Sequence, residues 1–146
     1  MKPEELMLGD IVTFEDCQND KEPVIIKIWS INQDGEAFAF IDDDESVDEI
    51  VIDDEIVGIP LTQEILEKNG FENITSRLES SEQYIHLYEI NDDIVIGELP
   101  SGFNICIERY NGDYDVYEHF SFCSICNIHE LQHALKLCGI DKTIEL

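Results

Sequence analysis

The residues best suited to catalysis lie close to the C-terminus, in the segment His129-Glu130-Leu131-Gln132-His133. This H-E-x-x-H pattern is typical of zinc peptidases, because histidines four residues apart share a helix face and can bind one zinc ion while the glutamate acts as general base. Such a site needs a third ligand, and the position of the third histidine in metzincins holds Gly139. Asp141, Glu145 and His119 are the remaining candidates. The pattern therefore indicates a small zinc-dependent hydrolase as one hypothesis.

The same helix has a purely structural interpretation. Asn127 and Glu130 have the spacing of a capping box, in which the glutamate accepts a backbone hydrogen bond at the first turn. At about 100° per residue, His129 and His133 point away from the expected core face, and Lys136 lies between them, where a cation opposes metal binding. The residues of that core face are Leu131, Ala134, Leu135 and Cys138. We therefore expect no catalytic residue, no metal site and no cofactor, and we keep the zinc hydrolase as an alternative.

A second metal-like pattern overlaps the first, since Cys123 and Cys126 form a C-x-x-C pair just before the two histidines. Structural zinc sites use such pairs, but the step from Cys126 to His129 is far shorter than the roughly dozen residues of a zinc finger. Metal binding by these cysteines and histidines therefore stays open. The chain has five cysteines, and this odd number favours reduced thiols. Cys106 and Cys138 are expected to be small core residues.

The charge of the chain is its most unusual property: 34 acidic residues stand against 8 Lys and Arg, for a formal net charge of −26 over 146 residues. Hydrophobic residues make up 43 % of the chain, which is too many for a disordered acidic tail. No apolar run reaches the roughly 18–20 residues of a membrane span, and no stretch resembles a signal peptide. We therefore expect a soluble cytoplasmic protein. Phosphates are contacted by Lys and Arg, so the excess of carboxylates argues against direct binding to nucleic acid or to an anionic membrane.

Nine acidic residues lie within residues 42–55, which we call the acidic run, and no Lys or Arg occurs between Lys27 and Lys68. A calcium loop is not favoured, because Val47 occupies the position where an EF-hand requires glycine. The run is either a solvated loop or a phosphate mimic. In the second interpretation, carboxylates on a β scaffold attract a basic, nucleic-acid-binding protein over long range. The candidate partner-binding residues are Asp42, Asp43, Asp44, Glu45, Asp48, Glu49, Asp53, Asp54 and Glu55.

The elements that must position these residues follow an α+β pattern. Residues 1–60 form one expected subdomain, a small SH3-like β-barrel by analogy of strand number and spacing. Its short strands are expected at 11–14, 24–30, 37–41, 50–52 and 56–59. The second subdomain, 61–146, is expected to begin with a helix capped by Thr62 and ended by Gly70. It continues with a loop or irregular hairpin at 72–83 and an antiparallel β meander at 84–90, 94–98, 103–109 and 114–122. A helix at 128–138 and a short strand at 143–146 follow.

Three segments, taken in order, give the chain a family resemblance. They are EELMLGDIV (4–12), IPLTQEILEKNGF (59–71) and IHELQHAL (128–135). The chain resembles a group of small uncharacterised proteins of Bacteroides-type gut bacteria, which are often found in phages and mobile elements. The resemblance covers most of the chain. It implies this architecture and a mobile-element context, and it implies no catalytic residue.

Three hypotheses for the function follow. The first is a non-enzymatic acidic binding protein that mimics nucleic acid and inhibits a host nucleic-acid-binding or defence enzyme, with the acidic run as the contact surface. The second is the zinc-dependent hydrolase that uses His129, Glu130 and His133. The third is a structural or accessory module of a mobile element. The oligomeric state is left open by the sequence.

Overall fold

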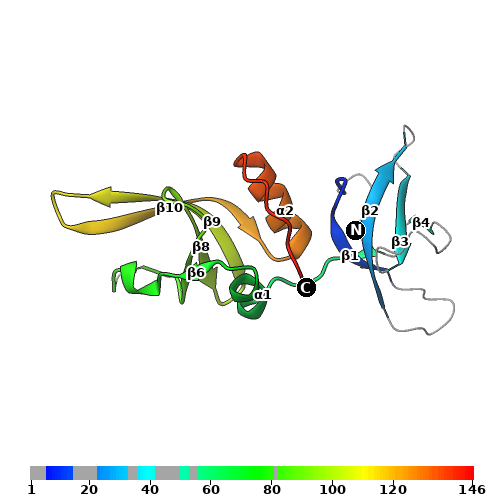
Figure 1. Ribbon diagram of the computed structural model, residues 1–146. Coiled ribbons are helices and arrows are strands. Elements are labelled where there is room, and N and C mark those ends of the chain that lie inside the picture. The colour runs from blue at the N-terminus through cyan, green and yellow to red at the C-terminus, as the bar shows by residue number, and fades with distance from the viewer. Residues whose placement is uncertain (1–5, 15–22, 33–35, 42–49, 53–55, 81) are drawn as a thin grey trace. The chain divides into compact units, whose positions relative to one another are not determined.

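The computed structural model describes residues 6–14, 23–32, 36–41, 50–52, 56–80 and 82–146 (Figure 1). The chain divides into two compact units. The first unit contains Met1–Pro60 and Asn127–His133, and the second contains Leu61–Cys126 and Ala134–Leu146. The described residues contain antiparallel sheets and two α-helices, so the expected α+β class is confirmed. No helix in that part of the chain is long and apolar enough to cross a membrane.

The sheet of the first unit is an open one with the order β4-β3-β2-β1-β5. Its strands are β1 (Ile11–Phe14), β2 (Val24–Ile31), β3 (Ala37–Ile41), β4 (Ile50–Ile52) and β5 (Ile56–Val57). They lie where the sequence predicts them, although β5 is two residues shorter. No pairing joins β4 to β5 among the described residues, so the expected closed SH3-like barrel is not confirmed.

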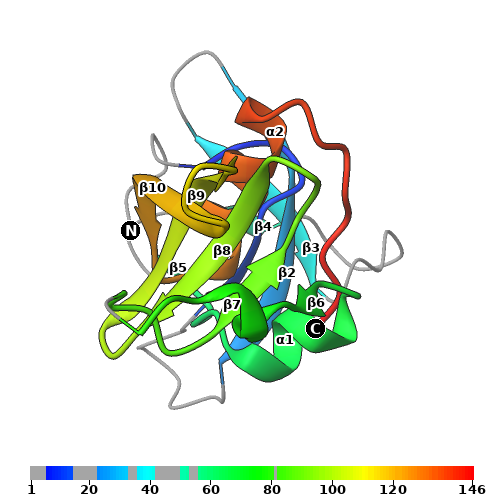
Figure 2. The same cartoon turned by 90° about the vertical axis from the view of Figure 1, so that its left-hand side faces the viewer.

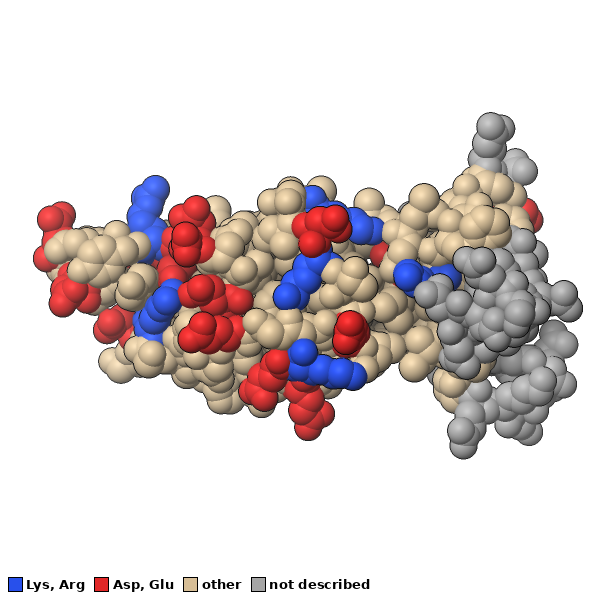
Figure 3. Space-filling model, viewed as in Figure 1, with Lys and Arg blue, Asp and Glu red and all other residues tan. Residues whose placement is uncertain are grey.

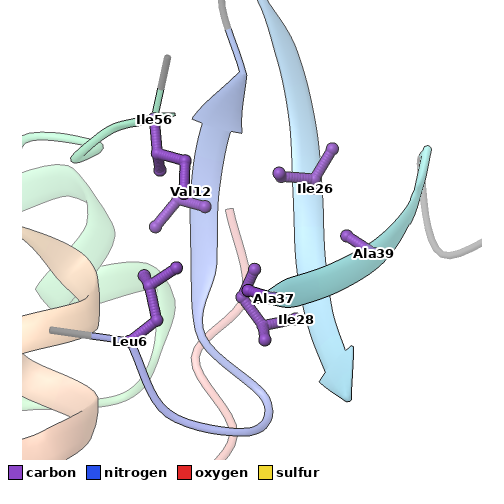
Figure 4. Packing of buried hydrophobic residues seen from close by; sticks show 7 residues of the cluster. All are labelled: Leu6, Val12, Ile26, Ile28, Ala37, Ala39 and Ile56. Atoms are coloured by element: carbon purple, nitrogen blue, oxygen red, sulfur yellow. The ribbon is translucent and has the colours of Figure 1, made fainter. Parts of the chain in front are cut away.

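The core of the first unit is a cluster of aliphatic side chains contributed mainly by its strands (Figure 4). Alternate residues of a strand face the same side, which brings Ile26 and Ile28 of β2 together with Ala37 and Ala39 of β3. Burial of each isoleucine contributes about 1.5–3 kcal/mol. The buried members of the cluster are Leu6, Val12, Ile26, Ile28, Ala37, Ala39 and Ile56.

The sheet of the second unit has the order β10-β9-β8-β7-β6 (Figure 2). Its strands are β6 (Glu72–Asn73), β7 (Leu87–Glu89), β8 (Ile94–Leu99), β9 (Gly102–Asn111) and β10 (Val116–Ile125). The predicted four-strand meander is present as β7 to β10. The predicted strand at 84–90 is shorter than expected. The segment 72–83, predicted as a loop or irregular hairpin, contains β6, which pairs antiparallel with β7, and the 3-10 helix η2 (Thr75–Arg77).

The two helices begin and end close to the predicted residues. In α1 (Gln63–Lys68), the Thr62 hydroxyl accepts a hydrogen bond from the Ile65 N–H at 3.3 Å. Gly70 follows the C-cap with a φ of 74°, a conformation in which glycine avoids the steric cost of a side chain. The second helix, α2 (Ile128–Leu137), ends one residue before the predicted end.

The predicted C-terminal strand at 143–146 is wrong, since these residues form no strand. The side chain of Asn69 pairs with them instead. Its Nδ2 donates to the Glu145 carbonyl at 2.8 Å, and its Oδ1 accepts from the Glu145 N–H at 2.7 Å. Ile144, which is 1 % exposed, packs inward beside this contact. The Asn69 amide, together with the Lys68 ammonium that donates to the Leu146 carbonyl, therefore holds the C-terminal residues without continuing a strand.

Candidate functional site

The nine acidic residues predicted to bind a partner lie outside the described residues. They are Asp42, Asp43, Asp44, Glu45, Asp48, Glu49, Asp53, Asp54 and Glu55. Between them in the sequence lies β4, which pairs antiparallel with β3 and forms one end of the sheet order. The acidic run is thus interrupted by a strand that belongs to the first unit's sheet.

The glutamate of the H-E-x-x-H pattern caps the first turn of α2. Glu130 Oε2 accepts a hydrogen bond from the Asn127 N–H at 2.9 Å, so the predicted capping contact is confirmed. The Asn127 side chain packs directly on Gly58, where an added Cβ would lie 2.7 Å from the Asn127 Cγ. Gly58 is therefore required for the close approach of this helix start to the chain after β5.

We expect Glu130→Ala to lower the free energy of unfolding by about 0.5–2 kcal/mol, because the Asn127 N–H loses its acceptor at the helix start. Urea denaturation followed by circular dichroism measures the change. Glu130→Gln is the control, since its amide oxygen still accepts the bond, and it should retain most of the stability. Equal stability of the alanine variant and the wild type would contradict the capping role.

The second histidine of the pattern, His133, contacts a carboxylate from the other end of the chain. Its Nε2 lies 3.0 Å from Oδ1 and 2.8 Å from Oδ2 of Asp10. The Asp10 side chain is fully buried, and its Oδ2 also accepts from the Met7 N–H at 2.7 Å. A metal ion at His133 would therefore have to use Nδ1, because the other ring nitrogen is engaged.

Gln132 completes the attachment of α2 to the turn before β1. Its Oε1 accepts from the Ile11 N–H at 3.1 Å, and its Nε2 donates to the Gly9 carbonyl at 3.1 Å. The side-chain amide thus satisfies one backbone donor and one backbone acceptor, as a neighbouring strand would. Together with His133, it fixes the start of α2 within the first unit.

The prediction that both histidines point away from the core is wrong. His129 is 5 % exposed, and its ring packs edge-on against His133 with centroids 5.8 Å apart. The side chain of His133 is 22 % exposed. The helical-wheel argument assumed a single apolar contact face, whereas the polar side of α2 packs on the turn that contains Asp10. The residues of the catalytic pattern therefore have structural partners.

The cysteines lie in separate environments. Cys123 is within β10 and Cys126 follows its end. Among the residues that the structure describes, no group of three or more His, Cys, Asp and Glu is arranged to hold a metal ion. Cys106 is fully buried beside Leu87 and Val95, which confirms its predicted core position. Burial raises the pKa of the Cys106 thiol and keeps it in the less reactive protonated form.

A buried charged cluster in the second unit was not predicted from the sequence. The His119 side chain has no exposed surface, and its two ring nitrogens face two glutamates. Nδ1 lies 2.7 Å from Glu82 Oε2, and Nε2 lies 2.9 Å from Glu108 Oε2. Each ring nitrogen of His119 therefore lies within hydrogen-bond distance of a carboxylate. His119, considered above as a zinc ligand, instead joins the 82–84 segment to β9.

Arg77 extends this cluster on the other side of Glu108. Its guanidinium donates to Glu108 Oε1 at 2.7 Å and lies 3.0 Å from Glu89 Oε2. The guanidinium carbon also lies 5.2 Å from the centre of the Tyr117 ring, within the range of a cation–π contact. Glu108 is only 3 % exposed at its side chain, and both of its oxygens have cationic or donor partners. The cluster therefore connects η2 with β7 through Glu89, with β9 through Glu108 and with β10 through Tyr117.

Comparisons with known proteins give no functional assignment. Neither protein-family models, curated proteins nor solved structures yield a significant match to the chain. The function is therefore inferred from the charge and geometry of the chain itself.

Proposed function

We propose that the protein is a non-enzymatic acidic binding protein whose acidic run, residues 42–55, imitates the phosphates of a nucleic acid. Its partner is a basic, nucleic-acid-binding protein, which it inhibits by occupying the nucleic-acid surface. The observation that carries the proposal is the net charge of −26, with nine acidic residues in the run. Such a charge destabilises a small fold through self-repulsion, and faster association with a basic partner is the gain that offsets it.

The position of the run in the sequence also favours a binding role. Its acidic residues flank β4, the end strand of the first sheet, which ties the run to a folded unit. An SH3-like fold for this unit is part of the proposal, since its strand number and spacing are those of such barrels. The resemblance to mobile-element proteins favours a host nucleic-acid enzyme as the inhibited partner.

Neutralising the run should slow association with the partner by about 10- to 100-fold at low salt while the dissociation rate changes little, because steering acts on the encounter. The variant replaces six acids with Asn or Gln. Partners are first captured from a host lysate at low and high salt, and surface binding kinetics are then measured for both proteins at two salt concentrations. The replaced residues are Asp42, Asp43, Asp44, Glu45, Asp48 and Glu49.

A matched variant separates a local effect from the loss of total charge. It replaces six exposed acids of the second unit, and its association rate should fall much less than that of the run variant. Equal association rates for the run variant and the wild type, or a captured partner without a basic surface, would contradict the mimicry and leave a solvated loop. The control residues are Glu64, Glu67, Glu72, Asp92, Asp113 and Asp141.

A further inference from the structure

The outer edge of β10 is open in the second unit. Among the described residues only β9 pairs with β10, and no other backbone hydrogen bond reaches residues 116–125. An edge strand presents backbone N–H and C=O groups to any strand that comes alongside, and natural edges are often protected by lysine or proline. β10 contains neither residue. Its register shift is confined to Ser121–Cys123, so the part from Val116 to Ser121 is regular.

A groove follows this regular part of the strand. We call it the β10 groove; it has a volume of about 590 Å³. Successive side chains of a strand face opposite sides of the sheet, so a lining of six consecutive residues is the pattern expected of a groove that follows the strand edge. Six residues also match the length of a typical strand, about 17–20 Å. The lining residues are 116–121 of β10 together with Glu79, Glu82, Gln83 and Tyr84.

The wall opposite β10 is held in place by the buried cluster. Glu82 Oε2 contacts His119 at 2.7 Å, and the Glu82 N–H donates to the Glu79 carbonyl at 3.0 Å. The groove is thus formed in the second unit without a partner, and a bound segment would not have to order this wall first. Preformed sites lose less conformational entropy on binding than flexible ones.

The chemistry of the groove favours a basic and partly apolar occupant. Its acidic lining residues are Glu79, Glu82 and Glu118, and its described lining contains no Lys or Arg. Phe120 is 52 % exposed and can cover the aliphatic stem of a lysine whose ammonium reaches a carboxylate. Figure 3 shows further acidic side chains at the left-hand end of the view, over the tip of the β9–β10 hairpin.

We propose that the β10 groove binds an extended, lysine- or arginine-containing segment of a partner protein by strand addition to β10. Backbone hydrogen bonds to the edge supply affinity, and the glutamates select basic side chains. A second copy of this chain is disfavoured, because two acidic grooves and two net charges of −26 would be brought together. The proposal goes beyond the proposed function, since residues 42–55 take no part in it.

The test uses the full chain and an eight-residue peptide of alternating lysine and valine, blocked at both ends. Its matched control has the same sequence with N-methyl groups on alternate residues, which keep the charge and remove strand pairing. We expect the plain peptide to slow hydrogen exchange of the β10 amides and to bind at least tenfold more tightly than the methylated one. Equal binding of both peptides, no binding at low salt, or protection outside β10 would overturn the proposal.

Protein variants test the role of the glutamates. Glu79→Gln combined with Glu118→Gln should weaken binding of the plain peptide by about tenfold, the effect of two exposed ion pairs. Glu64→Gln combined with Glu67→Gln removes the same charge from α1 and should change binding less than twofold. Equal losses in the two variants would overturn the selection of basic side chains. Protection of β10 that grows with protein concentration in the absence of peptide would identify a second copy as the occupant instead.

Discussion

Glu108→Ala should lower the free energy of unfolding by about 3–5 kcal/mol, the cost of removing one partner from a buried ionic cluster. The Glu108 carboxylate is 3 % exposed and contacts Arg77 at 2.7 Å and His119 at 2.9 Å. Alanine would leave the buried imidazole of His119 without one of its two acceptors and would deprive Arg77 of its shorter ion pair. Urea denaturation of the variant and the wild type at the same pH measures the loss.

Two further variants show whether the loss comes from the cluster. Glu108→Gln keeps the shape and one acceptor, so it should cost less than the alanine variant. Glu72→Ala removes an exposed glutamate from β6 and should change stability by no more than about 0.5 kcal/mol. A loss of similar size in Glu72→Ala, or no loss in Glu108→Ala, would contradict the assigned role of the cluster.

Asp10→Ala should lower the free energy of unfolding by about 2–4 kcal/mol. The fully buried carboxylate accepts from the Met7 N–H at 2.7 Å and contacts His133 Nε2 at 2.8 Å. Alanine removes the acceptor for both donors and leaves a cavity beneath the start of α2. Thermal and urea unfolding of the variant are the measurements.

A double-mutant cycle with His133→Ala isolates the contact between the two side chains. We expect a coupling energy of about 0.5–3 kcal/mol, because residues in direct contact are not additive. Additive losses would contradict the pairing. Metal analysis of the same proteins separates this role from the hydrolase hypothesis: one zinc ion per chain that is lost in His133→Ala, together with a hydrolytic activity, would favour the enzyme.

The elements that local physics determines could be predicted from the sequence. The strand alternation gave β1 to β4 nearly residue by residue, and Thr62 and Gly70 marked the ends of α1 because capping depends on neighbouring residues only. The contact between Glu130 and Asn127 is local in the same sense. The prediction of a terminal strand was wrong because the local sequence does not show which group will bind the backbone there. In the structure, the Asn69 side chain pairs with Glu145 where a neighbouring strand would otherwise pair.

The contacts that join distant parts of the chain could not be predicted in this way. Asp10 and His133 are 123 residues apart, and nothing in either local pattern indicates the other. The pairing of His119 with Glu108 depends on the hairpin register, in which the two residues are direct cross-strand partners. Placing β10 from 114 rather than from 116 obscured that register. A correct assignment of the turn between β9 and β10 would have fixed the register and placed His119 opposite Glu108.

The grouping of Asn127–His133 with the first sixty residues has a consequence for synthesis of the chain in the cell. At about 5–20 residues per second, the ribosome adds His133 about 6–25 s after Asp10. During that interval the newly made N-terminal sheet lacks Gln132 and His133, so the Gly9 carbonyl, the Ile11 N–H and the Asp10 carboxylate must stay hydrated. The first unit is therefore completed only after α2 has been made, and a fragment cut at residue 60 would expose the polar turn that this helix covers.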